Sequence, residues 1–303
     1  MWLNRLFYNL HFFYYLTSEP GLKHQKNLFL IGGNEDRKPK GELLSHFISL
    51  CGQSPHIIVI SGASAVPEQV ANDYHDIFLK MGASRVDRIL FQDRKDGVHK
   101  ENFDLLEKAD GVFITGGNQV KLVGTMGGTP FHKNLVDKIS NGLVYGGTSA
   151  GASIVSRIMI AGGRGSFNPR KNTVKISGGL GILDGVIIDQ HFRERNRLYR
   201  LATAVSTNPG ELAIGIDENT ALHIVDDHLC QVYGSNSVTV LDGEEMEYTA
   251  FSETSGSDPI TMCGMKFHVL TKGFGYDLKK RAPDILGNSK FVNKKQKLSE
   301  VIF

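Results

Sequence analysis

Cysteine is scarce in this sequence, and its three copies are widely spaced. Cys51, Cys230 and Cys263 are odd in number, and no two of them form a C-x-x-C pair. This pattern argues against a disulfide framework and against a structural zinc site. A reducing compartment fits it best, so we expect a cytoplasmic protein.

The sequence also lacks a large excess of charge of either sign. A net charge of +2 over 303 residues gives no overall attraction to nucleic acid or to acidic membranes. We therefore expect no nucleic-acid partner and no stable association with a membrane. Hydrophobic residues make up 41% of the chain, which is enough for one large α/β domain or two small ones.

Long hydrophobic runs are missing as well. Residues 1–16 are rich in aromatics and leucine, but asparagine and histidine interrupt them too often for a transmembrane helix, and no small residues mark a cleavage site. We interpret residues 1–26 as an N-terminal extension that packs on the surface or in an oligomer contact, as in a homodimer, or as residues upstream of the true start. An export signal is the alternative interpretation.

Apolar runs that alternate with helical patterns predict an α/β fold. Such alternation indicates βαβ units, and hence a mostly parallel, doubly wound sheet with helices on both faces. Short strands between residues 221 and 241 are expected to extend one edge of the sheet in antiparallel fashion. The main strands are predicted at residues 27–31, 56–60, 86–91, 111–115, 143–145, 186–189 and 212–216. The helices are predicted at residues 42–51, 67–81, 102–108 and 150–160.

Residues 27–278 are expected to form a single catalytic domain. Beyond them, seven basic residues lie between positions 279 and 297 with little apolar periodicity, so we interpret residues 279–303 as a basic C-terminal tail. Within the domain, the first strand ends in glycines and delivers a charged loop, Asn34 to Lys38. Loops at strand ends are where function concentrates.

A single serine stands between glycines at the end of a predicted strand. Gly147, Ser149 and Gly151 form the pattern G-x-S-x-G. A serine at a sharp strand-to-helix turn needs small neighbours, because the chain passes closely and its backbone is strained. We predict that Ser149 is a catalytic nucleophile. The alternative is an ordinary glycine-rich turn, since short motifs of this kind have false positives.

A serine nucleophile needs a base and a group that orients the base. His191 and Glu218 each follow a predicted strand, so they are expected at the same edge of the sheet as Ser149. We predict a Ser149, His191, Glu218 triad. Asp217 is the alternative to Glu218, because adjacent residues at a strand end point in opposite directions.

The same edge supplies amides for the oxygen of a reacting carbonyl. We predict an oxyanion hole formed by the amides of Gly117 and Ala150. Asp189 and His191 lack the paired histidines at i, i+4 that mark a zinc-protease helix. We therefore expect no metal and no other cofactor.

Four arginines follow the predicted catalytic histidine: Arg193, Arg195, Arg197 and Arg200. If the segment is helical, the first, third and fourth fall near one face and Arg195 points elsewhere. Exposed arginines usually form only a solvated face. Their place directly behind a histidine at a strand end favours recognition of an anion.

Four separated motifs give the chain a family resemblance. They are TGGNQ from Thr115, GTSAGA from Gly147, DQHF from Asp189 and GIDENT from Gly215. In this order they resemble cyanophycinase, from about residue 28 to residue 278. Cyanophycinases stand with the aspartyl dipeptidases in a serine-peptidase group whose fold resembles the class I glutamine amidotransferases. The triad order of that group is Ser, His, Glu, as predicted here.

The resemblance implies an exopeptidase that releases β-Asp-Arg dipeptides from cyanophycin, a polyaspartate backbone that bears arginine on its β-carboxyls. A dipeptidase for small α- or β-aspartyl peptides and a catalytically silent peptide-binding relative are the alternatives. The chain departs from the expected pattern at Asn34, where we expect a third glycine. The substrate-binding residues implied by the resemblance and by the arginine chemistry are Gln119, Asp189, Gln190, Arg195, Arg197 and Arg200.

Overall fold

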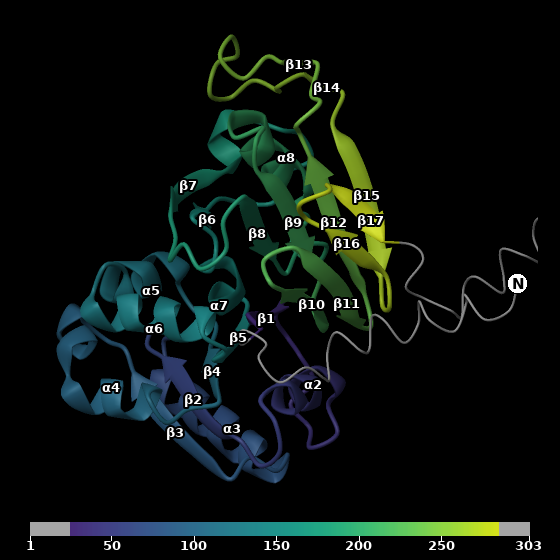
Figure 1. The fold of residues 1–303 in the computed structure, drawn as a ribbon. Helices are drawn as coiled ribbons and strands as arrows, with labels where there is room; N and C mark the ends of the chain where they lie inside the picture. The colour runs from purple at the N-terminus through teal and green to yellow at the C-terminus, as the bar shows by residue number, and fades with distance from the viewer. Residues whose placement is uncertain (1–24, 285–303) are drawn as a thin grey trace, which may run out of the picture.

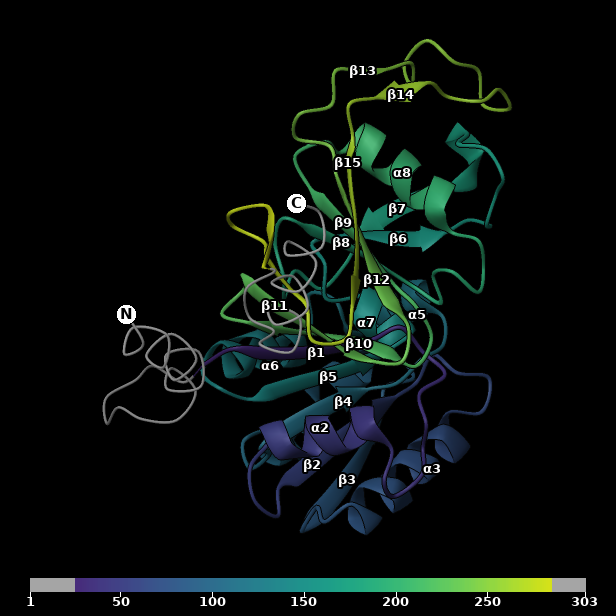
Figure 2. The same cartoon turned by 90° about the vertical axis from the view of Figure 1, so that its right-hand side faces the viewer.

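The computed structural model describes residues 25–284, so nearly all of the predicted N-terminal extension lies outside the described residues. Two large sheets organise the described part (Figure 1). The larger has the order β17-β16-β11-β10-β1-β5-β4-β2-β3, and the smaller has the order β15-β12-β9-β8. In Figure 2 the smaller sheet occupies the upper half of the molecule and the parallel part of the larger sheet the lower half.

The larger sheet has a parallel core of five strands, as predicted. Their side chains alternate between two apolar clusters, because successive residues of a strand point to opposite faces. Leu28 and Leu30 belong to one cluster, and Phe29 and Ile31 to the other. The five strands are β1 (Asn27–Ile31), β2 (His56–Ser61), β3 (Arg85–Leu90), β4 (Gly111–Ile114) and β5 (Val144–Thr148).

Helices cover both faces of this core, which confirms the doubly wound α/β class. Apolar residues of α2 and α3 pack in the cluster with Phe29, and those of α4, α5 and α6 pack in the cluster with Leu28. The helices are α2 (Glu42–Leu50), α3 (Pro67–Lys80), α4 (Lys100–Leu106), α5 (Gln119–Met126) and α6 (Pro130–Ser140). Among the described residues, no helix is both long enough and apolar enough to cross a membrane.

Antiparallel strands extend the β1 edge, as predicted for residues 221–233, but residues 237–241, which were expected at the same edge, pair in the smaller sheet instead. They are β10 (Thr220–Val225), β11 (Leu229–Gly234), β16 (Gly275–Asp277) and β17 (Ala282–Asp284). The last of them lies inside the segment predicted as a basic tail, so ordered sheet continues past residue 278 to Asp284.

The smaller sheet was not predicted. Residues 186–189 and 212–216 were expected in the main sheet, but they pair with each other and then with later strands. Ile188 and Ile214 face the large cluster of the main sheet, whereas Ile187 and Ala213 face α8 (Leu198–Thr207). A strand buried on both faces has the same apolar run in either sheet. The strands are β8 (Val186–Gln190), β9 (Leu212–Ile216), β12 (Ser237–Asp242) and β15 (Lys266–Thr271).

The predicted helix at residues 150–160 is wrong beyond its first turn. α7 spans only Ala150–Ser153, and β6 (Ile158–Gly162) follows and pairs with β7 (Lys175–Gly178). Ile154, Val155, Ile158 and Ile160 are β-branched, which lowers helix propensity and favours a strand. A second small pair, β13 (Tyr248–Thr249) and β14 (Met262–Cys263), lies beyond β12.

Candidate active site

Three strand ends meet where the two sheets join, and each carries one predicted triad residue. Ser149 follows β5 of the larger sheet, and His191 and Glu218 follow β8 and β9 of the smaller one. The hydroxyl of Ser149 is 2.9 Å from Nε2 of His191. Nδ1 of His191 is 2.6 Å from Oε1 of Glu218. The structure therefore brings the three side chains into one hydrogen-bonded chain.

The turn at Ser149 is sharp, and its neighbours must be small. Ser149 has φ +53° and ψ −113°, a backbone conformation that residues with a side chain rarely adopt. A Cβ on Gly151 would lie 2.1 Å from the carbonyl oxygen of Ile114, and one on Gly147 would lie 2.4 Å from the carbonyl oxygen of Gly151. The glycines of the motif are thus required by close backbone contacts, and the turn presents the serine hydroxyl.

The loop that follows β1 packs against His191 and holds it in place. The amide of His191 donates to the carbonyl of Gly32 at 2.8 Å. A Cβ on Gly33 would lie 2.3 Å from the imidazole ring, so the ring occupies the space that glycine leaves. Burial lowers the pKa of His191, and this effect exceeds the opposing hydrogen bond to Glu218. The imidazole is therefore neutral near pH 7 and can accept a proton.

Glu218, and not its neighbour Asp217, holds the histidine. The second carboxylate oxygen of Glu218 accepts a hydrogen bond from Nδ2 of Asn34 at 2.8 Å. Burial raises the pKa of Glu218, but the hydrogen bonds from His191 and Asn34 outweigh it and leave the pKa below its usual value. Asp217 is 1% exposed and accepts from the amide of Arg193 and from the hydroxyl of Ser237. Its role is to fix the turn behind the histidine.

Two amides lie beside the serine without an acceptor. Within residues 25–284, neither Gly117 nor Ala150 donates its amide hydrogen to another group. Gly117 has φ +142°, and a Cβ there would lie 2.4 Å from the carbonyl of Ala63, so only glycine fits. The oxyanion hole formed by these two amides stays a prediction, with which their lack of an acceptor agrees.

This arrangement agrees with a comparison against protein families. The model of Peptidase family S51 matches residues 28–232, more than half of the chain. The chain belongs to peptidase family S51. It is a serine-type peptidase, and hence a hydrolase.

Curated relatives of this S51 peptidase are named cyanophycinase. The protein of Geminocystis herdmanii is 36% identical over 261 residues, which cover 86% of this chain and 96% of the relative. The protein of Synechococcus elongatus is 36% identical over 258 residues, covering 84% of this chain and 80% of the relative. The chain is thus cyanophycinase-like over most of its length.

Two solved structures share the fold at lower identity. A peptidase from an acI-B1 actinobacterium superposes with a TM-score of 0.60 at 21% identity, covering 84% of this chain and 98% of that one. A putative peptidase E protein of Listeria monocytogenes gives a TM-score of 0.51 at 21% identity, covering 70% of this chain and 100% of that one. Both support the peptidase fold of the S51 chain.

Two of the residues predicted to bind substrate form a buried ion pair. Asp189 accepts from Nε of Arg200 at 2.7 Å and from its terminal nitrogen at 2.5 Å, and each residue is 1% exposed. Arg200 also donates to the carbonyl of Gly163 at 2.8 Å. A direct contact of either with substrate stays a prediction, while in this structure the two residues bind each other. The pair anchors the strand end that carries His191.

The remaining arginines differ in exposure. Arg197 is 7% exposed and donates to Asp189 and to the carbonyl of Gln190, and burial lowers its pKa to about 10. Arg195 is exposed, and within residues 25–284 its guanidinium has no hydrogen-bond partner. The prediction of one helical arginine face is wrong, because the segment turns and α8 begins only at Leu198. Arg193 is exposed as well, but its guanidinium donates to Glu194 and Asn236.

The two predicted glutamines lie close to the serine or to its surroundings. Oε1 of Gln190 is 3.3 Å from the Ser149 hydroxyl, and Gln190 is 3% exposed. Gln119 donates from its side chain to the carbonyl of Ile160 at 3.0 Å. Gln190 therefore touches the nucleophile directly, whereas Gln119 ties α5 to β6.

The loop after β1 contributes more to the site than the sequence indicated. A pocket of about 210 Å³ lies beside Ser149 and His191, and Asn34 and Arg37 of this loop line it. Between them, Glu35 has a side chain with no exposed surface. The charged composition of the loop and its place at a strand end were visible in the sequence, but not the direction of each side chain.

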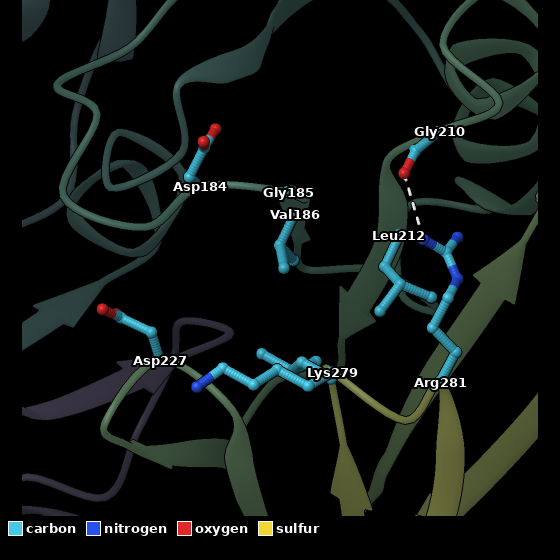
Figure 3. A pocket seen from close by; sticks show the side chains of 9 residues that line it. Asp184, Gly185, Val186, Gly210, Leu212, Asp227, Lys279 and Arg281 are labelled. Atoms are coloured by element: carbon cyan, nitrogen blue, oxygen red, sulfur yellow. Dashed lines mark hydrogen bonds between the residues drawn. The ribbon is translucent and has the colours of Figure 1, made fainter.

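A second hollow, of about 290 Å³, lies at the opposite ends of β8 and β9 (Figure 3). Three of its four charged residues have partners: Asp184 pairs with Arg157, Asp227 with Lys26, and Arg281 with Asp242. Among the described residues, no group of three or more His, Cys, Asp or Glu is arranged to hold a metal ion. The hollow offers no unpaired cluster that suggests a reaction.

Proposed function

We propose that this S51 peptidase hydrolyses cyanophycin through an acyl-enzyme on Ser149 and releases β-Asp-Arg dipeptides. One observation carries the proposal: Ser149, His191 and Glu218 form a continuous hydrogen-bonded chain at 2.9 and 2.6 Å. The cyanophycinases that are 36% identical over most of the chain supply the substrate class.

The first half of the reaction forms the acyl-enzyme. Nε2 of His191 takes the proton of the Ser149 hydroxyl while the oxygen attacks the scissile carbonyl carbon. The carbonyl oxygen becomes negative and is held by the amides of Gly117 and Ala150. The tetrahedral intermediate then expels the amine of the leaving aspartate, which receives the proton from His191.

The second half releases the acyl group. A water molecule gives its proton to His191 and attacks the ester carbon, and the Ser149 oxygen leaves with the proton that His191 returns. The charge of Glu218 stabilises the imidazolium in both halves. Its hydrogen bond with Asn34 keeps the carboxylate aligned with Nδ1 of the imidazole.

The surroundings of the triad suit an acidic, amide-rich substrate. The exposed guanidinium of Arg195 can pair with a free carboxylate through two parallel hydrogen bonds. The buried amide of Gln190 borders the nucleophile. A dipeptidase for small aspartyl peptides is the second candidate, because a pocket of about 210 Å³ also suits a dipeptide.

The test separates these substrates. Purified protein is incubated with cyanophycin and, in parallel, with β-Asp-Arg, isoaspartyl and α-aspartyl dipeptides, and the products are identified by mass spectrometry. We expect β-Asp-Arg from cyanophycin and no further cleavage of the dipeptide. Ser149→Ala serves as the matched control and should release nothing. Cleavage of free dipeptides without release from cyanophycin would transfer the function to the second candidate.

A further inference from the structure

The pocket beside the nucleophile contains one permanently charged side chain. Tyr74, Gly117, Ser149 and His191 are among the described residues that line it, and Arg37 alone of that lining set carries a fixed charge. Arg195 does not belong to the lining, and its segment packs instead near Glu218. Arg37 is therefore the fixed charge that a ligand in this pocket meets.

Arg37 is held from behind by buried groups. Nε of Arg37 lies 3.5 Å from Oε1 of Glu35, and its guanidinium carbon lies 4.6 Å from the centre of the Tyr74 ring. Glu35 in turn accepts hydrogen bonds from the hydroxyls of Tyr74 and Thr148. Thr148 directly precedes Ser149, so the support of Arg37 and the turn of the nucleophile share one buried carboxylate.

The outer end of Arg37 is open. Its side chain is 44% exposed, and within residues 25–284 Glu35 is the one acidic residue that forms an ion pair with it. Glu35 and Tyr74 occupy the Nε edge and one face of the guanidinium. The end that remains is the one that forms two parallel hydrogen bonds with a carboxylate. A side chain fixed in advance also loses little entropy when it binds.

We propose that Arg37 binds the free backbone carboxylate of the C-terminal aspartate, on the leaving side of the scissile bond, and so makes the enzyme select acidic substrates with an unblocked end. The inference rests on the proposed function and adds the residue that recognises the C-terminal end of the substrate. At an internal bond the backbone carboxyl of the aspartate is part of a peptide bond, so only the arginine side group offers a free carboxylate there. Arg37 thus explains in physical terms how a pocket this small favours cleavage from an end.

The test uses a matched pair of short substrates, one with free carboxylates and one with its C-terminus amidated. Wild type should prefer the free form by roughly 10- to 100-fold in kcat/KM, as expected for a charge-assisted hydrogen-bonded pair. Arg37→Gln should lose this preference and cleave the amidated substrate as wild type does. Arg37→Lys should keep part of this preference, because lysine retains the positive charge but cannot form the two parallel hydrogen bonds of a guanidinium.

Lys38→Gln is the matched control, since that side chain lies in the same loop and is 82% exposed. It should leave the preference unchanged. Thermal unfolding of each variant establishes that the fold is intact. Equal losses on both substrates in Arg37→Gln would assign Arg37 to a purely structural role and overturn the inference, while leaving the proposed function in place.

A binding measurement with β-Asp-Arg tests the inference even if the protein cleaves none of the substrates. Calorimetry compares Ser149→Ala with the double variant Ser149→Ala, Arg37→Gln. A loss of affinity of roughly 10-fold or more in the double variant supports the carboxylate contact. Equal affinity, or no binding by either protein, overturns it. Absence of hydrolysis by wild type, in contrast, refutes the proposed function.

Discussion

Replacing Glu218 by glutamine tests how much the acid contributes to the reaction. The carboxylate accepts a hydrogen bond from Nδ1 of His191 at 2.6 Å, and the charge becomes most valuable when the imidazole is protonated in the transition state. A charge-assisted hydrogen bond of this kind contributes about 1.5–3 kcal/mol, or roughly a 10- to 100-fold change in rate. The amide of glutamine can also donate to Nδ1, which places the imidazole proton on Nε2, where it blocks the serine.

Together these two effects predict a fall in kcat of about 10²- to 10⁴-fold in Glu218→Gln. The assay is single-turnover release of dipeptide from cyanophycin across pH, because it measures chemistry apart from product release. Asp217→Asn is the comparison: Asp217 binds the turn behind His191 and should cost stability more than rate. Wild-type rates in Glu218→Gln would refute the assignment of Glu218 as the orienting acid.

Four further outcomes are expected. Burial places the pKa of His191 below 6.5, so kcat/KM should rise with pH through a midpoint below 6.5 and then level off; a midpoint above 6.5 would contradict a buried neutral base. Ser149→Gly should be inactive yet about 1 kcal/mol more stable than Ser149→Ala in urea unfolding, because φ is +53° at this position. Arg200→Met should lower stability by about 3 kcal/mol, the low end for a broken buried pair, since Arg197 stays 3.3 Å from Asp189; an unchanged unfolding midpoint would exclude the pair as an anchor. Asn34→Ala should lower kcat by less than about tenfold, because its hydrogen bond to Glu218 is exposed.

Much of the parallel core could be predicted because its sequence pattern is local. Each apolar run of β1, β2, β4 and β5 is bounded by glycines or helical periodicity, and the structure has these strands in place. Local sequence patterns could not predict that β8 and β9 belong to a second sheet. A buried strand is apolar on both faces whichever neighbours it pairs with, and pairing is decided by contacts distant in the sequence.

The triad could be proposed from strand ends, but the arginines could not be sorted. Arg195, Arg197 and Arg200 look alike in sequence, and only their packing separates an exposed cation from a partner of Asp189. Glu218 was predicted with Asp217 as an open alternative for a similar reason, because the choice depends on side-chain direction at one turn, and the structure has Glu218 on the histidine. Asn34, noted only as a departure from an expected glycine, has a polar contact with Glu218.

The loop after β1 explains how a site split between two sheets keeps its geometry. Ser149 belongs to the larger sheet, whereas His191 and Glu218 belong to the smaller one, so any shift between the sheets would open the 2.9 Å contact between hydroxyl and imidazole. The loop binds both sides: the carbonyls of Gly32 and Gly33 accept from the amides of His191 and Asn219.

Glu35 and Asn34 extend this link to the side chains. Glu35 holds the hydroxyl of Thr148 beside the nucleophile at 2.7 Å, and Asn34 holds Glu218 at 2.8 Å. Consecutive residues therefore fix the serine from one side and the acid from the other. Arg37 belongs to the same loop and lines the pocket beside the nucleophile. The proposed carboxylate contact and the contacts that hold the triad therefore come from one short segment, residues 32–37.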